Sequence, residues 1–304
     1  MKQQTNTLLI ISGPTAVGKT DLCINLAKKF NTFIISADSR QFFREMNIGT
    51  AKPAPNLLEM VPHHFINSHS IHDSYDVRRY ETEVLELLKQ EFPTYNPIIL
   101  TGGSGLYVDA VVYGLDVMPD IDPKWREELN DLFRKEGLSV LQNQLKSMDP
   151  DYYAIVDLQN PQRVIRALEV CMGTGKPYSS FRIKKSAERP FHILKIALIR
   201  DRDELYQRIN LRMDQMIDEG LFEEAKELYP YRHLNALQTV GYTEIFGYMD
   251  GLYDREEAIR LLKRNSRRYA KRQLTWLRKD PDYHWFHPDA LNEIESFILN
   301  QIAR

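Results

Sequence analysis

Short apolar segments alternate with helical patterns along much of the chain. The segments 7–12 (TLLIIS), 32–38 (TFIISAD) and 191–200 (FHILKIALIR) are rich in β-branched residues, which is typical of buried strands. Apolar residues recur at helical spacing over 72–92, and the segment 96–114 predicts a strand, a glycine turn and a helix. Because strands alternate with helices, we predict an α/β fold with a parallel sheet flanked by helices.

The pattern changes in the middle of the chain. Between Asp116 and Pro190 the sequence is charged and helical in spacing, with few strand signals. We therefore predict a mainly helical domain at 116–190, inserted into a core formed by residues 1–115 and 191–304. From Asp201 onward the pattern is helical almost to the end, so the core should have a helical C-terminal part.

Composition is that of an ordinary globular protein, with 43% hydrophobic and 27% charged residues. The two cysteines, Cys23 and Cys171, stand in no metal-ligand pattern, which argues against a disulfide framework or a structural zinc site. The N-terminal segment is too short for a signal peptide, and no apolar run approaches the roughly 18 residues of a membrane span. We expect a cytoplasmic monomer without a membrane partner.

The segment GPTAVGKT (13–20) matches the P-loop pattern G-x-x-x-x-G-K-[ST] of nucleotide-binding proteins in full. It follows a predicted strand and opens a predicted helix over about 19–30, so backbone N–H groups and the helix N-terminus can cradle phosphates. Lys19 adds a positive charge, and the Thr20 hydroxyl can bind Mg²⁺. We predict that a diphosphate or triphosphate is bound by Gly13, Pro14, Thr15, Ala16, Val17, Gly18, Lys19 and Thr20.

A kinase or an NTPase also needs a carboxylate at the end of another strand, to hold the metal ion. The segment PIILTGGSG offers Thr101 and Ser104 but no acid, which weakens the kinase hypothesis. The acid nearest a predicted strand end is Asp38, in SADSRQFF. Asp38 could cap a following helix, or it could lie in the crevice where parallel sheets bind ligands.

Seven motifs, in order along nearly the whole chain, resemble those of the bacterial tRNA dimethylallyltransferases, the IPP transferase family. They are GPTAVGKT (13–20), SADSRQFFREMNIGTAKP (36–53), PHHFIN (62–67), TGGSGLY (101–107), NPQRVIRALEV (160–170), VGYTEI (240–245) and YAKRQLTWLR (269–278). The resemblance implies transfer of the dimethylallyl group from dimethylallyl diphosphate to the exocyclic amine of the adenine 3′-adjacent to the anticodon of tRNA. Diphosphate would be released, and Mg²⁺ would be the cofactor. The loop would then hold an isoprenoid diphosphate, for which the missing carboxylate is no anomaly.

The resemblance also implies roles for single residues. Asp38 would accept the proton of the adenine amine, and Thr15 would lie near the reacting amine and the diphosphate. Arg208 and Arg212 stand four residues apart, and so on one predicted helical face. The family match makes Arg212 the better candidate for a diphosphate ligand, although both arginines could instead lie on a solvated helix face.

Contacts with the tRNA anticodon stem-loop are implied by the family match for Asp38, Ser39, Arg40, Gln41, Ser104, Gln162, Arg163, Val164, Ile165 and Arg166. The formal net charge is only −2, yet residues 260–279 hold nine Lys or Arg and no Asp or Glu. Such a basic segment is typical of a nucleic-acid-binding surface. We expect Arg267 and Arg268 to contact the tRNA backbone, although these charges could also be solvated or paired within the protein.

Other functions fit part of the sequence. One is a small-molecule enzyme, either a P-loop kinase or a prenyltransferase acting on free adenine nucleotides, and another is an RNA-binding module without catalysis. The inserted domain and the basic segment favour a large polyanion, and the intact P-loop with Asp38 favours an enzyme. His63, His64, His69 and His72 could suggest a metal site, but their spacing matches no helical ligand pair, so we expect none.

Overall fold

The computed structural model describes residues 5–183 and 187–302. The chain divides into two compact units, one made of Met1–Val112 and Glu188–Arg304 and the other of Tyr113–Ala187. The limits of the second unit differ by about three residues at each end from the insertion predicted at 116–190.

The larger unit contains a six-stranded sheet in which every neighbouring pair is parallel, so the predicted α/β class is confirmed. The strand order is β3-β2-β4-β1-β5-β6. The strands are β1 (Thr7–Ser12), β2 (Ile34–Ser36), β3 (His63–His64), β4 (Ile98–Gly102), β5 (His192–Leu198) and β6 (His284–Phe286). Two of them, β3 and β6, were not predicted, because two or three residues are too few to show an alternating pattern.

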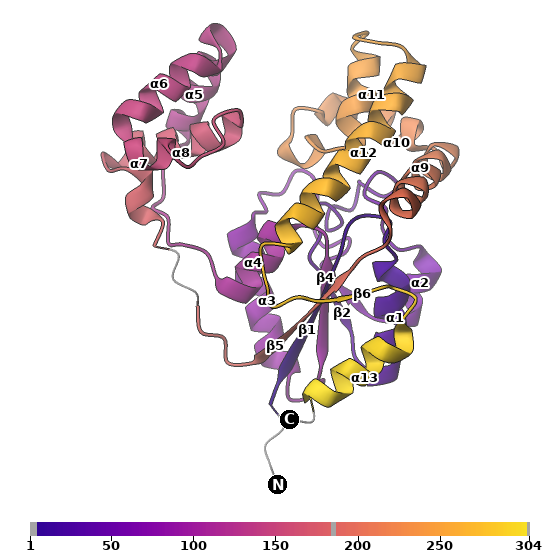
Figure 1. Cartoon of the computed structure of the whole chain (residues 1–304). Coiled ribbons are helices and arrows are strands. Elements are labelled where there is room, and N and C mark those ends of the chain that lie inside the picture. Colours follow the sequence, from indigo (N-terminus) through magenta and orange to yellow (C-terminus); the bar gives the residue numbers. More distant parts are fainter. Residues whose placement is uncertain (1–4, 184–186, 303–304) are drawn as a thin grey trace. The chain divides into compact units, whose positions relative to one another are not determined.

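Helices cover both faces of this sheet, as Figure 1 shows: α1 (Lys19–Phe30) and α13 (Leu291–Ile302) lie on one face, and α3 (Val77–Glu91) and α4 (Gly105–Tyr113) lie on the other. The helix predicted at 19–30 is confirmed. Leu9 and Ile11 of β1 belong to one buried cluster with Leu26 of α1 and Ile298 of α13. Since side chains alternate along a strand, Leu8 and Ile10, which are also fully buried, face the opposite layer.

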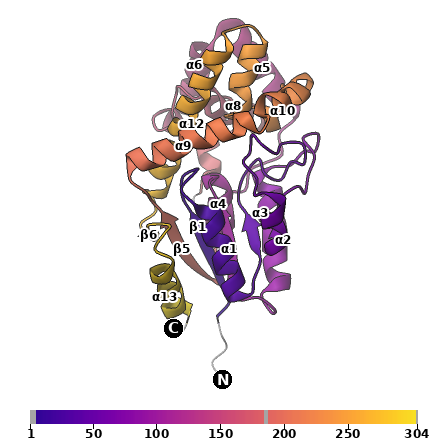
Figure 2. The same cartoon turned by 90° about the vertical axis from the view of Figure 1, so that its right-hand side faces the viewer.

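A group of helices lies beyond the carboxyl ends of the strands, as Figures 1 and 2 show. It comprises α9 (Arg202–Asp218), α10 (Leu221–Leu228), α11 (Tyr242–Met249) and α12 (Arg255–Leu277), with one-turn helices η2 (Tyr229–Tyr231) and η3 (Asn235–Leu237). A second buried cluster joins these helices to the segment after β2, through residues such as Phe42, Met46, Leu221, Tyr242 and Leu262. The short helix α2 (Pro55–Met60) follows that segment.

The smaller unit is helical, as the sequence predicts. It contains α5 (Pro123–Glu136), α6 (Leu138–Met148), α7 (Pro150–Tyr153), α8 (Pro161–Thr174) and the one-turn helix η1 (Tyr178–Phe181). Its core includes Leu129, Leu141, Leu145 and Leu168. The carboxylate of Asp149 accepts hydrogen bonds from the Tyr152 and Ser179 backbone N–H groups, which ties η1 to the start of α7.

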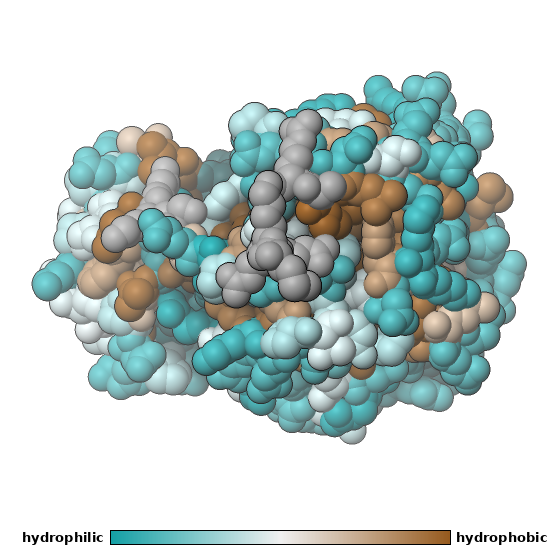
Figure 3. All heavy atoms as spheres, turned by 90° about the horizontal axis from the view of Figure 1, so that it is seen from below, coloured by the Kyte–Doolittle hydropathy of each residue, from teal (hydrophilic) through white to brown (hydrophobic). Residues whose placement is uncertain are grey.

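The face seen from below in Figure 3 is mostly hydrophilic, with apolar side chains in limited patches. Large apolar side chains that are exposed, such as Met60, Leu106 and Leu299, belong to different helices. Within the described ranges, no helix combines the length and the apolar character needed to cross a membrane.

Candidate active site

A cavity of about 720 Å³ lies at the carboxyl ends of the strands, where open parallel sheets bind ligands. Its walls are built from the P-loop, the segment after β2, the end of β4, and helices α9 and α12. The lining residues come from the segments 15–23, 34–41, 49–53, 63–66, 101–103, 208–216, 238–241 and 266–273. Segments that are far apart in the sequence therefore meet around one space.

The P-loop presents the N-terminus of α1 to the cavity. Gly18, with φ of 112°, caps the helix and has no side chain to occupy its first N–H groups. The Lys19 ammonium donates to the carbonyl oxygens of Gly13 and Pro14, at 2.9 Å in each case. Burial, and then repulsion from Arg212, lowers the pKa of Lys19 to about 8. An anion bound in the cavity would stabilise the charged form of Lys19 and so raise this pKa again.

Two arginines hold the P-loop by its backbone carbonyl oxygens. Arg200 Nε donates to the Val17 carbonyl at 2.9 Å, and Arg208 Nε donates to the Ala16 carbonyl at 2.9 Å. The Arg200 guanidinium also forms ion pairs with Glu204 and Asp289. The role of Arg200 could not be predicted from the sequence, because no local motif marks a residue that acts on a loop more than 180 positions away.

Asp38 lies just beyond β2 and lines the cavity. Its Oδ1 accepts a hydrogen bond from the Arg40 backbone N–H at 2.9 Å, which forms a tight turn. No helix follows Asp38 before α2, so the helix-capping alternative is wrong. Burial raises the pKa of Asp38, against the opposing effects of the Arg40 N–H and the Lys19 charge. A carboxylate with a raised pKa is a better proton acceptor.

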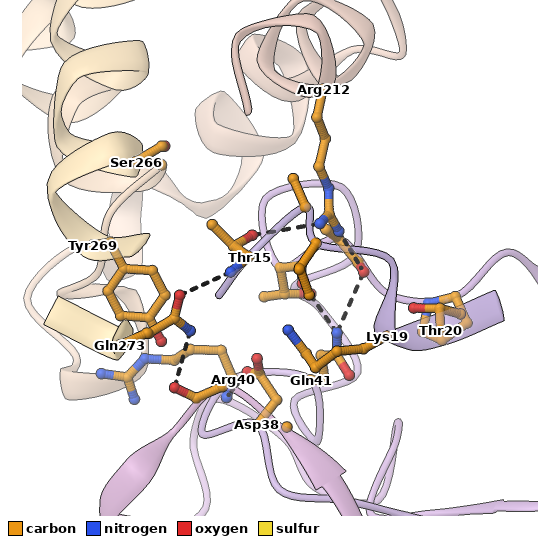
Figure 4. A pocket seen from close by; sticks show the side chains of 18 of the residues that line it. Thr15, Lys19, Thr20, Asp38, Arg40, Gln41, Arg212, Ser266, Tyr269 and Gln273 are labelled. Carbon is orange, nitrogen blue, oxygen red and sulfur yellow. Dashed lines mark hydrogen bonds between the residues drawn. The ribbon is translucent and has the colours of Figure 1, made fainter. Parts of the chain in front are cut away.

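Thr15 stands between two polar side chains, as Figure 4 shows. Its backbone N–H donates to Gln273 Oε1 at 2.8 Å, and Arg212 Nη1 lies 3.4 Å from its Oγ1. Arg212 Nη2 donates to the Ala51 carbonyl at 3.2 Å. Both arginines line the cavity, but Arg212 is half-buried there, whereas Arg208 is exposed and its Nε is bonded to the Ala16 carbonyl. The geometry therefore favours Arg212 as the inward-facing cation.

The predicted residues after Asp38 cluster around it. The Ser39 backbone N–H donates to Ser104 Oγ at 2.9 Å, which links the ends of β2 and β4. Gln41 Oε1 accepts from Ser36 Oγ, and its Nε2 donates to the carbonyls of Thr50 and Ala51. Arg40 lines the cavity beside Asp38, as Figure 4 shows.

A second loop of the cavity wall depends on Glu224, which the sequence motifs do not mark. The Glu224 carboxylate accepts hydrogen bonds from three successive backbone N–H groups, those of Asn47, Ile48 and Gly49, at 2.8 to 2.9 Å. It also accepts from the Tyr242 hydroxyl at 2.6 Å. This carboxylate satisfies donors that would otherwise be unpaired, and so it shapes the wall next to Arg212.

The predicted contact residues on α8 divide into two classes. Gln162 and Arg163 are exposed. Val164 and Ile165 are 0% and 1% exposed and belong to the core of the helical unit. Their buried side chains are not available for the predicted contact with tRNA. Arg166 is half-buried and donates to Glu169 at 3.1 Å.

The basic segment forms most of α12, and part of its charge is used within the protein. Arg267 Nη1 donates to Asn210 Oδ1 at 2.6 Å, Lys263 pairs with Asp214, and Arg260 pairs with Glu257. Arg268 and Lys271 are exposed. Arg272 lines the cavity. Several of these residues are therefore paired within the protein, which was the alternative to tRNA binding. Arg268 is exposed and stays a candidate for contact with the tRNA backbone.

The histidines near β3 take part in packing. His63 Nδ1 lies 2.7 Å from the Val61 carbonyl, and the His69 ring lies 3.7 Å from the Tyr75 ring, between centroids. Within the part of the chain that the structure describes, no group of three or more His, Cys, Asp or Glu side chains is placed to hold a metal ion.

Comparison with known proteins places this chain in a family. A model of the IPP transferase family matches residues 41–280. A tRNA dimethylallyltransferase 1 of Bacteroides fragilis is 52% identical, covering 97% of this chain and 98% of its own length. A tRNA dimethylallyltransferase of Cytophaga hutchinsonii is 53% identical and covers 96% of each chain.

Solved structures that are similar to this chain have related names. The full-length tRNA isopentenylpyrophosphate transferase of Bacillus halodurans is 39% identical, with a TM-score of 0.72 over 98% of this chain and 97% of that one. A eukaryotic dimethylallyltransferase, described in crystals as acting on tRNA, is 28% identical with a TM-score of 0.70, over 90% of this chain and 70% of that one. The P-loop, the Asp38 segment and the α12 motif thus occur in a chain that belongs to the IPP transferase family.

Proposed function

We propose that this enzyme transfers the dimethylallyl group of dimethylallyl diphosphate to the exocyclic amine of the adenine 3′-adjacent to the anticodon of tRNA, giving N6-(dimethylallyl)adenosine. The observation that carries the proposal is that a P-loop and the carboxylate of Asp38 face one cavity. The P-loop suits a diphosphate leaving group, and the carboxylate suits an amine that must lose a proton. The similarity to tRNA dimethylallyltransferases supports the same function and does not favour the alternatives.

The reaction replaces one bond with another. The bond between the allylic carbon and the diphosphate oxygen breaks, and its electron pair leaves with diphosphate. The lone pair of the adenine amine forms the new C–N bond, and the amine proton passes to Asp38. Lys19, Arg212 and the N–H groups at the start of α1 would stabilise the charge that develops on the leaving group. Asp38 would act as the general base.

The donor set fits Mg²⁺ only if the substrate provides most of the ligands. Thr20 is exposed at the cavity and can supply one hydroxyl. Because no group of three His, Cys, Asp or Glu side chains among the described residues is placed to hold a metal ion, diphosphate oxygens and water would complete the shell, as is usual for Mg²⁺. When bound, Mg²⁺ would neutralise charge on the diphosphate.

The adenine must leave its stack to enter the cavity, which is less costly in a single-stranded loop than in a duplex. Ser39, Arg40 and Gln41 line the cavity with Asp38, and Ser104 accepts a hydrogen bond from the Ser39 N–H. We expect these four residues to contact the extruded nucleotide. Gln162 and Arg163, in the helical unit, stay predicted tRNA contacts. The predicted cytoplasmic location and monomeric state also stay predictions.

The experiment that tests this function is mass spectrometry of tRNA nucleosides after incubation with dimethylallyl diphosphate and Mg²⁺. We expect one added C5H8 unit on the adenosine next to the anticodon, and an equal amount of diphosphate. Modification of free AMP, ADP or ATP in place of tRNA would favour the small-molecule alternative. Consumption of ATP in proportion to product would favour the kinase alternative.

Replacement of Arg268 by Ala should weaken tRNA binding and flatten its salt dependence. Each lost phosphate contact is expected to lower the slope of log K against log[salt] by about 0.7–0.9. The matched control is Arg260→Ala, since the Arg260 side chain on the same helix is paired with Glu257. The measurement is tRNA affinity at several salt concentrations. Equal slopes for the wild type and Arg268→Ala would exclude Arg268 from the tRNA contact.

The affinity for dimethylallyl diphosphate should fall as the pH rises above about 8, the pKa of Lys19. The bound diphosphate favours the charged ammonium, so binding raises this pKa. The full affinity is therefore expected below pH 8, and above it the affinity should fall by up to about tenfold per pH unit. The charges that face Lys19 are those of Asp38 and Arg212. Binding should be measured between pH 7 and 9.5 at constant ionic strength. The control is Lys19→Arg, which stays charged over this range and should show no such break.

A further inference from the structure

Gln273 of α12 joins the P-loop to the end of β4. Its Oε1 accepts a hydrogen bond from the Thr15 backbone N–H at 2.8 Å, and its Nε2 donates to the Gly103 carbonyl at 3.0 Å. The side chain is 6% exposed. A Cβ atom added at Gly103 would lie 2.1 Å from Gln273 Nε2, so the glycine leaves just enough room for the amide.

An amide is the side chain that suits this position. It must accept at one atom and donate at the next, without bringing a charge toward Asp38 and the diphosphate site. Glutamate would keep the acceptor but lose the donor and add a negative charge. Methionine would fill the same space and leave both the Thr15 N–H and the Gly103 carbonyl without their partner.

The contacts of Thr15 make this position important for the chemistry. Its backbone is held by Gln273 on one side, and its hydroxyl faces Arg212 on the other. The remainder of the P-loop is held separately, by Arg200 at Val17 and by Arg208 at Ala16. Loss of the Gln273 amide would therefore displace Thr15 and leave the rest of the diphosphate-binding loop in place.

The same face of α12 reaches the segment around Asp38. Tyr269, one turn before Gln273, lines the cavity beside Ser104, which accepts a hydrogen bond from the Ser39 N–H. One helix thus contacts both the loop that holds the leaving group and the wall beside the proton acceptor.

We propose that Gln273 is a positioning residue for the transfer step: it sets Thr15, and through Thr15 the Arg212 guanidinium, at the geometry that the reaction needs. The inference rests on the proposed function, because it assigns a role within that reaction. It predicts an effect on turnover that is separate from the affinity for either substrate. A residue that only stabilised the fold would lower the melting temperature and the amount of active enzyme without this separation.

The test compares Gln273→Met with Thr275→Val, an exposed position on the same helix. We expect Gln273→Met to lower kcat by up to about 10²-fold, since small displacements of reacting groups can cost that much. The dissociation constants for dimethylallyl diphosphate and tRNA should change by less than about threefold, well below the factor of ten that 1.4 kcal/mol represents. Thr275→Val should match the wild type. Gly103→Ala, whose Cβ would displace the amide, should reproduce the loss of turnover independently.

A double-mutant cycle identifies the route of the effect. In a Thr15→Val background, Gln273→Met should cost much less than it does in the wild type, because both changes disturb the same group. Losses that multiply would overturn the inference, as would unchanged kcat in folded Gln273→Met or Gly103→Ala enzyme. If the wild type itself transferred no dimethylallyl group, the proposed function would fail instead, and the two failures are thereby distinguished.

Discussion

Asp38→Asn should lower kcat by about 10²–10⁴-fold, the usual size of general-base catalysis, while dimethylallyl diphosphate binds with nearly wild-type affinity. Asparagine has the same shape and keeps the side-chain oxygen that accepts from the Arg40 N–H, so the turn after β2 should be retained. The amide cannot take the proton of the adenine amine. The loss is thus expected in turnover alone.

The measurement is single-turnover transfer to tRNA together with diphosphate-ligand binding, each as a function of pH. Since burial raises the pKa of Asp38, wild-type turnover should decline as the pH falls toward that pKa and the carboxylate becomes protonated. The residual activity of Asp38→Asn should lack this acid limb. Near wild-type turnover in the variant, or an identical acid limb, would remove Asp38 from the proton transfer.

Lys19→Met should lower kcat/KM for dimethylallyl diphosphate by about 10²–10³-fold, comparable to the loss of one donor that stabilises transition-state charge. Its ammonium lies within the P-loop at the Gly13 and Pro14 carbonyls, where a diphosphate bound at the helix N-terminus would meet it. Both binding and turnover should decline, because the negative charge is present before the bond breaks and increases on the leaving oxygen.

The matched control for this variant is Lys28→Met, which removes a lysine from the last turn of the same helix, away from the cavity. Steady-state rates at varied dimethylallyl diphosphate and saturating tRNA provide the comparison. Equal kcat/KM for Lys19→Met and the wild type would mean that the P-loop does not hold the leaving group. ATP added to either enzyme should be left intact.

Features that depend on neighbouring residues were predictable from the sequence. The P-loop, the helix that follows it and the strand before it agree with the structure, because glycine spacing and apolar runs act within a few residues. The parallel α/β class followed from the alternation of strands and helices. Asp38 was assigned to the site through the motif around it, while position alone left helix capping open.

Other features were decided by packing between distant segments. The strand order β3-β2-β4-β1-β5-β6 depends on which apolar faces meet, and β3 and β6 are too short to leave a pattern in the sequence. The burial of Val164 and Ile165 likewise follows from how α8 packs in the helical unit. Motif similarity alone had grouped them with exposed Arg163.

The residues that support the site show most clearly that contacts between distant segments cannot be predicted from the sequence. Gln273 contacts Thr15 across 258 positions, Arg200 contacts Val17 across 183, and Glu224 binds the N–H of Ile48 across 176. A hydrogen bond between such positions leaves no periodic or local signal, because it exists only after the sheet and the helices have packed. The sequence by itself therefore determined the P-loop and placed Asp38 after a strand as the candidate proton acceptor, and the tertiary structure decided what holds them in place.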